Sequence, residues 1–257
     1  MDSPKVSLWI YLYRLGGMVY IFAGTLLSYL LVPSNRRSLH SRALWLQRWS
    51  RRTLALLGIE VEVRGELPTG GVVASNHLSY FDILVLSSVH PQIFLAKKEV
   101  ARWPLFGAFA RWAGTLFIDR RKRSDVSAQA NAFNRIIEAG LLLTLFLEGT
   151  TSDGSTVLPF RTALLEPAVQ RGWPVTPCAI YYDAVGADPA ETICYHGNMA
   201  LVPHFMGLIR RVVAAKATVR YGSADGLLTD RKQMAIHLRE EVLRLMTESA
   251  SAETGLK

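Results

Sequence analysis

The sequence predicts an α/β fold: a central, mostly mixed β-sheet covered by helices on both faces and preceded by N-terminal membrane-associated helices. From residue 60 onward, short apolar runs of strand length alternate with stretches of helical periodicity. Several runs are apolar almost throughout, which is typical of strands buried on both faces. Before residue 60, a long uncharged stretch is followed by a basic amphipathic one. We therefore expect membrane-anchoring helices at residues 1–58 and an α/β domain at residues 59–257.

The composition favours a protein that contacts a membrane. Of the 257 residues, 50% are apolar and only 19% are charged. The formal net charge of +8 favours anionic partners such as nucleic acid, acidic lipid or phosphorylated ligands. The two cysteines, Cys178 and Cys194, form no C-x-x-C motif, so neither a disulfide framework nor a zinc site is indicated. A reducing, cytoplasmic setting is the simplest interpretation.

The first long apolar stretch covers residues 15–32, which are eighteen consecutive uncharged residues. This length is just enough to cross a hydrocarbon core of roughly 30 Å. A retained membrane anchor and a buried core helix are both open, whereas a cleaved signal peptide fits poorly because no small-x-small cleavage site follows. Arginines such as Arg36 and Arg37 follow the stretch, and only Lys5 precedes it apart from the internal Arg14. This bias places the body on the cytoplasmic side of the inner membrane.

The stretch at residues 43–59 mixes arginines with apolar side chains such as Leu44, Trp45 and Leu54. It predicts an amphipathic helix lying at the headgroup level of an anionic membrane surface, where arginine stems snorkel.

The domain that follows is expected to contain eight strands and at least two long helices. The expected strands are residues 61–64, 72–75, 93–97, 115–119, 141–146, 175–182, 191–196 and 217–221. Helical periodicity is clearest at residues 125–139 and 230–246.

The segment NHLSYFD, residues 76–82, carries one histidine and one carboxylate five positions apart. In a regular helix five residues turn through roughly 500°, which would keep His77 and Asp82 apart. They meet only across a bend, with a strand ending near Ser75 and a helix starting near Ser79. Asp82 could then orient the His77 ring as a general base. The alternative is that Ser79 and Asp82 form a capping-box variant that only finishes a helix start.

Three further segments accompany NHLSYFD in a fixed order: GTLFIDR (114–120), FLEGTTS (146–152) and WPVTPCAI (173–180). Together with the linker AKKEVARWPLFG (96–107), this set resembles the glycerolipid acyltransferase family, typified by bacterial 1-acyl-glycerol-3-phosphate acyltransferases. The resemblance covers about residues 60–225, and four ordered blocks are far more specific than one.

The resemblance implies a chemistry that agrees with the residues. His77, held by Asp82, would deprotonate a lysolipid hydroxyl, which then attacks an acyl thioester; no serine or cysteine nucleophile is needed. The oxyanion would need donors, for which Lys98, or backbone amides near it and Gly149, are candidates. The donor would be acyl-CoA or acyl carrier protein, with no tightly bound cofactor and no metal.

The resemblance also implies an acceptor site. Arg120 would hold the anionic headgroup, although it could belong, with Arg121–Arg123, to a solvated basic patch. Glu148, Gly149 and Thr150 would shape the acceptor pocket, the alternative for Glu148 being a structural ion pair. The fourth block would form the wall of an acyl-chain tunnel or an ordinary core strand.

The third block departs from the family's usual F-P-E-G-T-R-S, because Leu147 replaces the proline and Thr151 replaces the arginine. The residues after it resemble the subgroup that acylates lyso-ornithine lipid, whose headgroup is an amino acid. Arg161 could supply the missing charge, or simply stand where the family often has lysine. The first expectation is therefore a lysophosphatidic acid acyltransferase making phosphatidic acid for phospholipid biosynthesis, and the alternative is a lyso-ornithine lipid O-acyltransferase.

Two other classes stay open: a non-catalytic lipid-binding membrane protein, and a hydrolase that uses the histidine on water. A nucleic-acid role is disfavoured, because the basic residues are not interleaved with aromatics on a recognisable binding module. The remaining histidines have no partner at metal-ligand spacing and are expected to be surface or hydrogen-bonded core residues. They are His40, His90, His196, His204 and His237.

Overall fold

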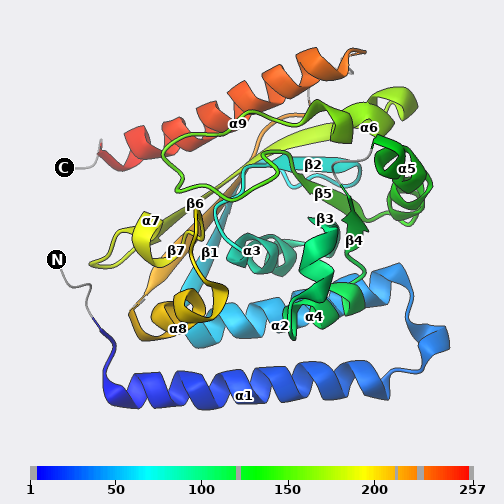
Figure 1. Cartoon of the computed structure of the whole chain (residues 1–257). Coiled ribbons are helices and arrows are strands. Elements are labelled where there is room, and N and C mark those ends of the chain that lie inside the picture. Colours follow the sequence, from blue (N-terminus) through cyan, green and yellow to red (C-terminus); the bar gives the residue numbers. More distant parts are fainter. Residues whose placement is uncertain (1–4, 120–122, 212–213, 225–228, 255–257) are drawn as a thin grey trace.

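The computed structural model describes residues 5–119, 123–211, 214–224 and 229–254, and within them it forms one seven-stranded sheet (Figure 1). The order across the sheet is β1-β7-β6-β2-β5-β3-β4. The strands are β1 (Ile59–Arg64), β2 (Val72–Ser75), β3 (Gln92–Lys97), β4 (Leu116–Ile118), β5 (Leu142–Phe146), β6 (Val175–Ala184) and β7 (Ala215–Tyr221).

The sheet is mixed, as predicted. Strands β4, β3, β5, β2 and β6 run parallel to one another, β7 is antiparallel to β6, and β1 is parallel to β7. The central strand β2 therefore ends at the same edge as its neighbours β5 and β6. In open α/β sheets, the carboxyl ends of parallel strands are where ligands bind.

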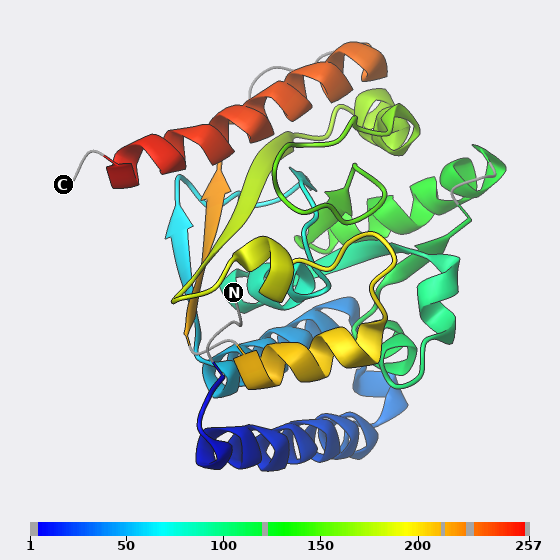
Figure 2. The same cartoon turned by 60° about the vertical axis from the view of Figure 1, so that its left-hand side comes forward.

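Helices cover both faces of the sheet, which confirms the predicted α/β class. In Figure 1, α9 lies above the sheet and α1 and α2 lie below it, and Figure 2 shows the same layers from another side. The α-helices are α1 (Leu8–Leu31), α2 (Leu39–Leu57), α3 (Phe81–Val89), α4 (Phe106–Trp112), α5 (Arg123–Glu138), α6 (Glu166–Arg171), α7 (Pro189–Thr192), α8 (Leu201–Arg211) and α9 (Arg231–Thr254). The described residues also form three short 3-10 turns: η1 (Ser34–Arg36), η2 (Lys98–Arg102) and η3 (Thr162–Leu165).

Helix α1 is longer than the predicted apolar stretch, because it begins at Leu8 and includes Arg14. The Arg14 guanidinium is buried and donates to the carbonyl oxygens of Leu57 (2.7 Å) and Ile209 (3.1 Å). These acceptors satisfy a charge that would be costly to bury unpaired. Of the helices in the described residues, α1 is the one long and apolar enough to cross a membrane.

Helix α2 also begins earlier than predicted, at Leu39, where the Ser38 side chain accepts from a first-turn amide. It ends at Gly58, whose φ of 72° is the left-handed conformation that favours glycine. Several of its apolar side chains, among them Trp49 and Leu57, are buried in the core with residues of α1, α3 and the sheet, whereas Leu44 is exposed. Its arginines include Arg51 and Arg52, which stay exposed.

Every predicted strand is confirmed except the one at residues 191–196, which is wrong. Asp188 caps the short helix α7, and Pro189 occupies its first position, so the chain turns helical there. The apolar residues that suggested a strand, Ile193 and Cys194, follow in a loop and fill the core instead. The helices expected at residues 125–139 and 230–246 are confirmed by α5 and α9.

Candidate active site

The histidine motif lies on a bend at the carboxyl end of β2, as predicted. The strand ends at Ser75, and α3 begins at Phe81. Asn76 fixes the start of the bend by pairing with the backbone of Ile180 on β6: its amide nitrogen donates at 2.9 Å and its amide oxygen accepts at 2.8 Å. The motif is therefore held by the neighbouring strand before the histidine is reached.

Across this bend His77 and Asp82 meet. The His77 Nδ1 and Asp82 Oδ2 atoms are 2.7 Å apart. Because a carboxylate only accepts hydrogen bonds, Nδ1 carries the proton in the neutral ring, and Nε2 presents a lone pair. This is the arrangement of an oriented general base.

Asp82 is fully buried, yet donors surround its carboxylate. Oδ2 also accepts from the backbone amides of Leu78 (2.7 Å) and Ser79 (3.0 Å). Asp82 therefore makes its half of the expected capping box by accepting from the Ser79 amide, and the same oxygen also orients His77. The Ser79 hydroxyl makes no hydrogen bond.

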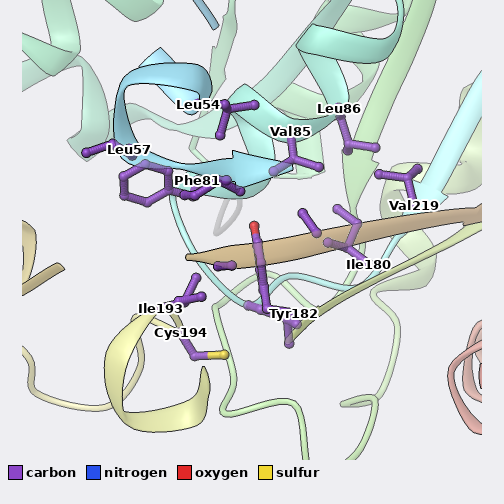
Figure 3. Close-up of a cluster of buried hydrophobic side chains, with 14 of the residues drawn as sticks. Leu54, Leu57, Phe81, Val85, Leu86, Ile180, Tyr182, Ile193, Cys194 and Val219 are labelled. Carbon is purple, nitrogen blue, oxygen red and sulfur yellow. The ribbon is translucent and has the colours of Figure 1, made fainter. Parts of the chain in front are cut away.

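The other Asp82 oxygen, Oδ1, accepts from the Tyr182 hydroxyl at 2.6 Å. Figure 3 shows the Tyr182 ring among Ile180, Ile193 and Phe81, with its hydroxyl directed toward α3. Since Tyr182 lies on β6, the Asp82 carboxylate is held by the sheet at Oδ1 and by the backbone amides of the bend at Oδ2. Burial raises the pKa of the Tyr182 hydroxyl well above its ordinary value, so it stays a donor.

The His77 ring packs flat on Phe146, the last residue of β5, with ring centroids 3.9 Å apart and an angle of 12° between the planes. The side chain of His77 is 18% exposed. Nε2 has no hydrogen-bond partner among the described residues. The ring is thus fixed on one face and at Nδ1, while Nε2 is available to a substrate hydroxyl.

Glu148 follows β5 and is almost fully buried. Its Oε1 accepts from the His77 backbone amide at 2.7 Å, and its Oε2 accepts from the Leu158 amide at 3.0 Å. Burial raises its pKa from 4.5 to about 7, against the opposing effect of these two amides. The structure therefore places Glu148 behind the histidine as a clamp on its backbone, rather than in an ion pair with a contacting cation.

The third block wraps around the first at this point. The Ser152 amide donates to the His77 carbonyl at 2.9 Å, and the Arg161 amide donates to the Leu147 carbonyl at 2.8 Å. Gly149 turns the chain with a φ of 73°, a conformation that L side chains rarely adopt. Thr150 is exposed beside it. Gly149 and Thr150 therefore lie in a segment that is hydrogen-bonded to the His77 loop through Ser152, and the exposed Arg161 lies beside Leu147 of the same block.

The two remaining predicted residues are Lys98, which forms an ion pair of its own, and Arg120. The Lys98 ammonium, about half exposed, pairs with the carboxylate of Asp119, and no hydrogen bond joins it to His77 or Asp82. Arg120 lies outside the described residues.

A cavity of about 170 Å³ lies behind the motif, between α1, α2, α3 and α4. Its wall is almost entirely apolar and includes Tyr80 and Phe81, the two residues that precede Asp82. A larger hollow, of about 690 Å³, lies near Gly70 and Pro174, at the opposite end of β2 and β6 from His77. The smaller cavity has the apolar wall that an acyl chain requires, and it reaches the histidine motif through Tyr80 and Phe81.

No three histidine, cysteine or acidic side chains in the described ranges gather as metal ligands do. Cys178 and Cys194 are free and buried. Of the other histidines, His204 bridges the Tyr80 hydroxyl and the Cys194 carbonyl, both at 2.9 Å. Sequence reasoning missed three residues that hold the pair: Asn76, Phe146 and Tyr182.

Comparisons with known proteins agree with this geometry. A protein-family model described as Acyltransferase matches residues 58–181. The chain is 36% identical over 223 residues to a lyso-ornithine lipid O-acyltransferase of Rhizobium meliloti, covering 79% of this chain and 75% of that one. It is 39% identical over 145 residues to a 1-acyl-sn-glycerol-3-phosphate acyltransferase of Neisseria meningitidis, covering 55% and 57%.

Among solved structures, the crystal structure of the 1-acyl-sn-glycerophosphate acyltransferase PlsC from Thermotoga maritima has the same fold. The TM-score is 0.68 at 21% identity, over 95% of each chain. The extent of the match to the Rhizobium enzyme, the family model and the oriented histidine together show that this chain belongs to the acyltransferase family that carries the His-x4-Asp motif.

Proposed function

We propose that this protein transfers a fatty acyl group from a carrier thioester to the free hydroxyl of a lysolipid at the cytoplasmic membrane. The observation that carries the proposal is the His77–Asp82 pair at 2.7 Å, in a ring whose Nε2 has no hydrogen-bond partner within the described part of the chain. Neither a serine nor a cysteine nucleophile is needed, since the acceptor brings its own hydroxyl.

In the proposed reaction, His77 Nε2 takes the proton of the acceptor hydroxyl as its oxygen attacks the thioester carbonyl. The new C–O bond gives a tetrahedral intermediate, whose C–S bond then breaks, and the imidazolium returns the proton to the departing sulfur. Asp82 keeps the ring oriented and stabilises its transient positive charge. Backbone amides near Gly149 and the Lys98 ammonium are the oxyanion candidates, a term of about 3 kcal/mol per donor. Lys98→Met tests the ammonium, and unchanged turnover would exclude it.

The apolar cavity is the proposed place for a fatty chain. Its lining residues Tyr80 and Phe81 belong to the same bend as His77, so a chain held there would keep its reacting end near the ring.

Lyso-ornithine lipid is the proposed acceptor. Thr151 supplies no positive fork for a phosphate where the family usually has arginine, and the relative from Rhizobium that matches over most of both chains is a lyso-ornithine lipid O-acyltransferase. Lysophosphatidic acid is the second candidate, because the Neisseria relative of higher identity acts on a glycerol phosphate and Arg161 is exposed beside the third block.

A product analysis by mass separates these candidates. Purified protein receives lyso-ornithine lipid or lysophosphatidic acid, each with acyl-CoA or acyl carrier protein as donor. We expect acylated ornithine lipid to dominate, and Thr151→Arg to move the product ratio toward phosphatidic acid. An unchanged ratio would contradict the fork argument. Free fatty acid released without an acceptor would instead indicate a hydrolase, and full cellular function of His77→Ala would indicate a non-catalytic lipid-binding protein.

The proposed membrane contact is the outer side of α1, lying in the plane of the cytoplasmic leaflet. Large apolar side chains on this side are exposed, whereas the other side packs on α2 along its length (Figures 1 and 2). The most exposed of the apolar side chains on α1 are Leu8, Trp9, Leu12, Tyr13, Val19, Tyr20, Leu27, Leu30 and Leu31. Because the buried Arg14 fastens α1 to α2 and α8, the helix stays against the domain rather than crossing alone.

Vesicle binding tests this contact. Leu27→Glu with Leu31→Glu should release the protein from vesicles containing anionic lipid. The matched control is Ile236→Glu, an exposed apolar position on α9 at the opposite side of the sheet. Protein that resists alkaline carbonate extraction would indicate that α1 spans the bilayer instead.

A further inference from the structure

Helix α9 is connected to the backbone of His77 by a series of hydrogen bonds that begins at Arg239. Arg239 on α9 is half-buried, and its Nε donates to the carbonyl oxygen of Val157 at 2.9 Å. Val157 itself is fully buried, so this carbonyl has little access to water.

The acceptor of Arg239 and the donor to Glu148 belong to one peptide group. The Val157 carbonyl accepts from the guanidinium, and the amide of the same peptide, on Leu158, donates to Glu148 Oε2 at 3.0 Å. A peptide with a cation at its oxygen and an anion at its N–H is polarised by both, and each hydrogen bond strengthens the other. The remaining oxygen, Glu148 Oε1, accepts from the His77 amide at 2.7 Å.

An unbroken chain thus runs from Arg239 through one peptide and one carboxylate to the backbone of His77. Each hydrogen bond in this chain has one charged partner, either the Arg239 guanidinium or the Glu148 carboxylate. Such charge-assisted hydrogen bonds are stronger than those between two neutral groups. We propose that Arg239 is a positioning residue for acyl transfer: it maintains the two-amide clamp of Glu148, and through that clamp the placement of the His77 ring. This proposal deepens the proposed function and rests on it.

The charges around Glu148 decide how the chain responds to pH. Burial raises the Glu148 pKa to about 7, and the Leu158 and His77 amides oppose this rise. Among the charges, Asp82 on α3 disfavours the Glu148 anion and Arg239 on α9 favours it. His77 contacts Glu148 through its backbone, and Arg161 stays exposed on the loop. Once protonated, Glu148 presents an O–H at one oxygen, so it no longer accepts fully from both amides. Loss of the Arg239 charge should therefore release the clamp at a higher pH.

The test compares pH profiles of acyl transfer for wild type and Arg239→Met. We expect the acid limb to move upward by about half to one pH unit, which lowers kcat by roughly 3- to 8-fold at pH 6.5, with a small change in KM. Near pH 8.5 the two proteins should approach one another. Arg239→Lys, which keeps the charge, should restore the wild-type profile.

Two further variants separate positioning from general damage. Arg244→Met, on the same helix but paired with Glu241 and Glu248, is the matched control and should leave the profile unchanged. In a Glu148→Gln background, Arg239→Met should no longer move the acid limb. A shift that persists in that background, or an equal loss at every pH, would overturn the proposal.

The pH dependence of unfolding gives a readout that needs no activity. Because the Arg239→Met change raises the Glu148 pKa, the variant should lose more stability than wild type between pH 5 and pH 8.5, followed by tryptophan fluorescence. If wild type transfers no acyl group to any lysolipid, the proposed function fails, but this measurement still tests the link. An identical pH dependence in both proteins would contradict the link itself.

Discussion

Glu148 should make the folded protein less stable as the pH rises, and removal of its charge should abolish that loss. Its pKa is about 7 in the folded protein against an ordinary value of 4.5, so the folded state binds more protons than the unfolded state between these limits. Stability therefore falls as pH rises through this window. With 1.36 kcal/mol per pKa unit, a shift of 2.5 units (7 − 4.5) gives about 3 kcal/mol.

The perturbation is Glu148→Gln, which has nearly the same shape and no titration. The amide nitrogen of glutamine cannot accept from a backbone amide, so the variant carries an offset, but that offset is independent of pH. We expect the difference in unfolding free energy between variant and wild type to change by about 3 kcal/mol, in favour of the variant, from pH 4.5 to pH 8.

Urea unfolding in detergent micelles, followed by tryptophan fluorescence at a series of pH values, measures this difference. All other titrating groups are common to both proteins and cancel. A flat difference across the series would refute the reasoning, because it would mean that Glu148 ionises in the folded protein as easily as in the unfolded chain. The expected change with pH would show that the ionised Glu148 carboxylate lowers the stability of the folded protein, which is typical of residues retained at functional sites.

Three other changes test the site. Asp82→Asn should lower kcat on the order of 10³- to 10⁴-fold, because an amide can accept at only one of its two positions, cannot satisfy all four donors around Asp82, and would favour the wrong ring tautomer; steady-state rates with unchanged circular dichroism check this. Tyr182→Phe removes one charge-assisted hydrogen bond to Asp82, so we expect a loss of about 1.5–3 kcal/mol in unfolding free energy and a fall in kcat with KM little changed. A change in KM with kcat unaltered would contradict this role of Tyr182. Ala113→Phe fills part of the apolar cavity, and competition between acyl donors of different length should show a shift toward shorter chains; unaltered preference would place the chain elsewhere.

The strands were predictable because their signals are local. The runs at residues 72–75 and 141–146 are short, apolar and bounded by polar turns, and both are strands buried on both faces. The run at residues 191–196 has similar composition, but Asp188 and Pro189 start a helix just before it. There the capping signal outweighed the apolar pattern, and a reading of the residues upstream would have found it.

In the site, the His77–Asp82 pair was predictable because five residues across a bend form a local motif. Tyr182 was not, since it lies 100 positions from Asp82 and looks like any aromatic residue of a buried strand. The sequence likewise predicts a core position for Phe146, and it stacks on the His77 ring only because β5 pairs with β2. Glu148 carried a signal, a carboxylate at the end of an apolar run, but its partners are backbone amides, which no sequence pattern displays.

The two carbonyls that satisfy Arg14 have a consequence for biogenesis. One of them, on Ile209, is 195 positions downstream, which at about 5–20 residues per second corresponds to a delay of roughly 10–40 s during translation. For that interval the nascent first helix exposes its guanidinium without the partner it will finally have. Under the proposed membrane contact, the exposed apolar side of α1 would hold the nascent helix at the lipid surface, where water still reaches the Arg14 charge. The rest of the enzyme would then be synthesised next to the membrane to which its first helix is already bound.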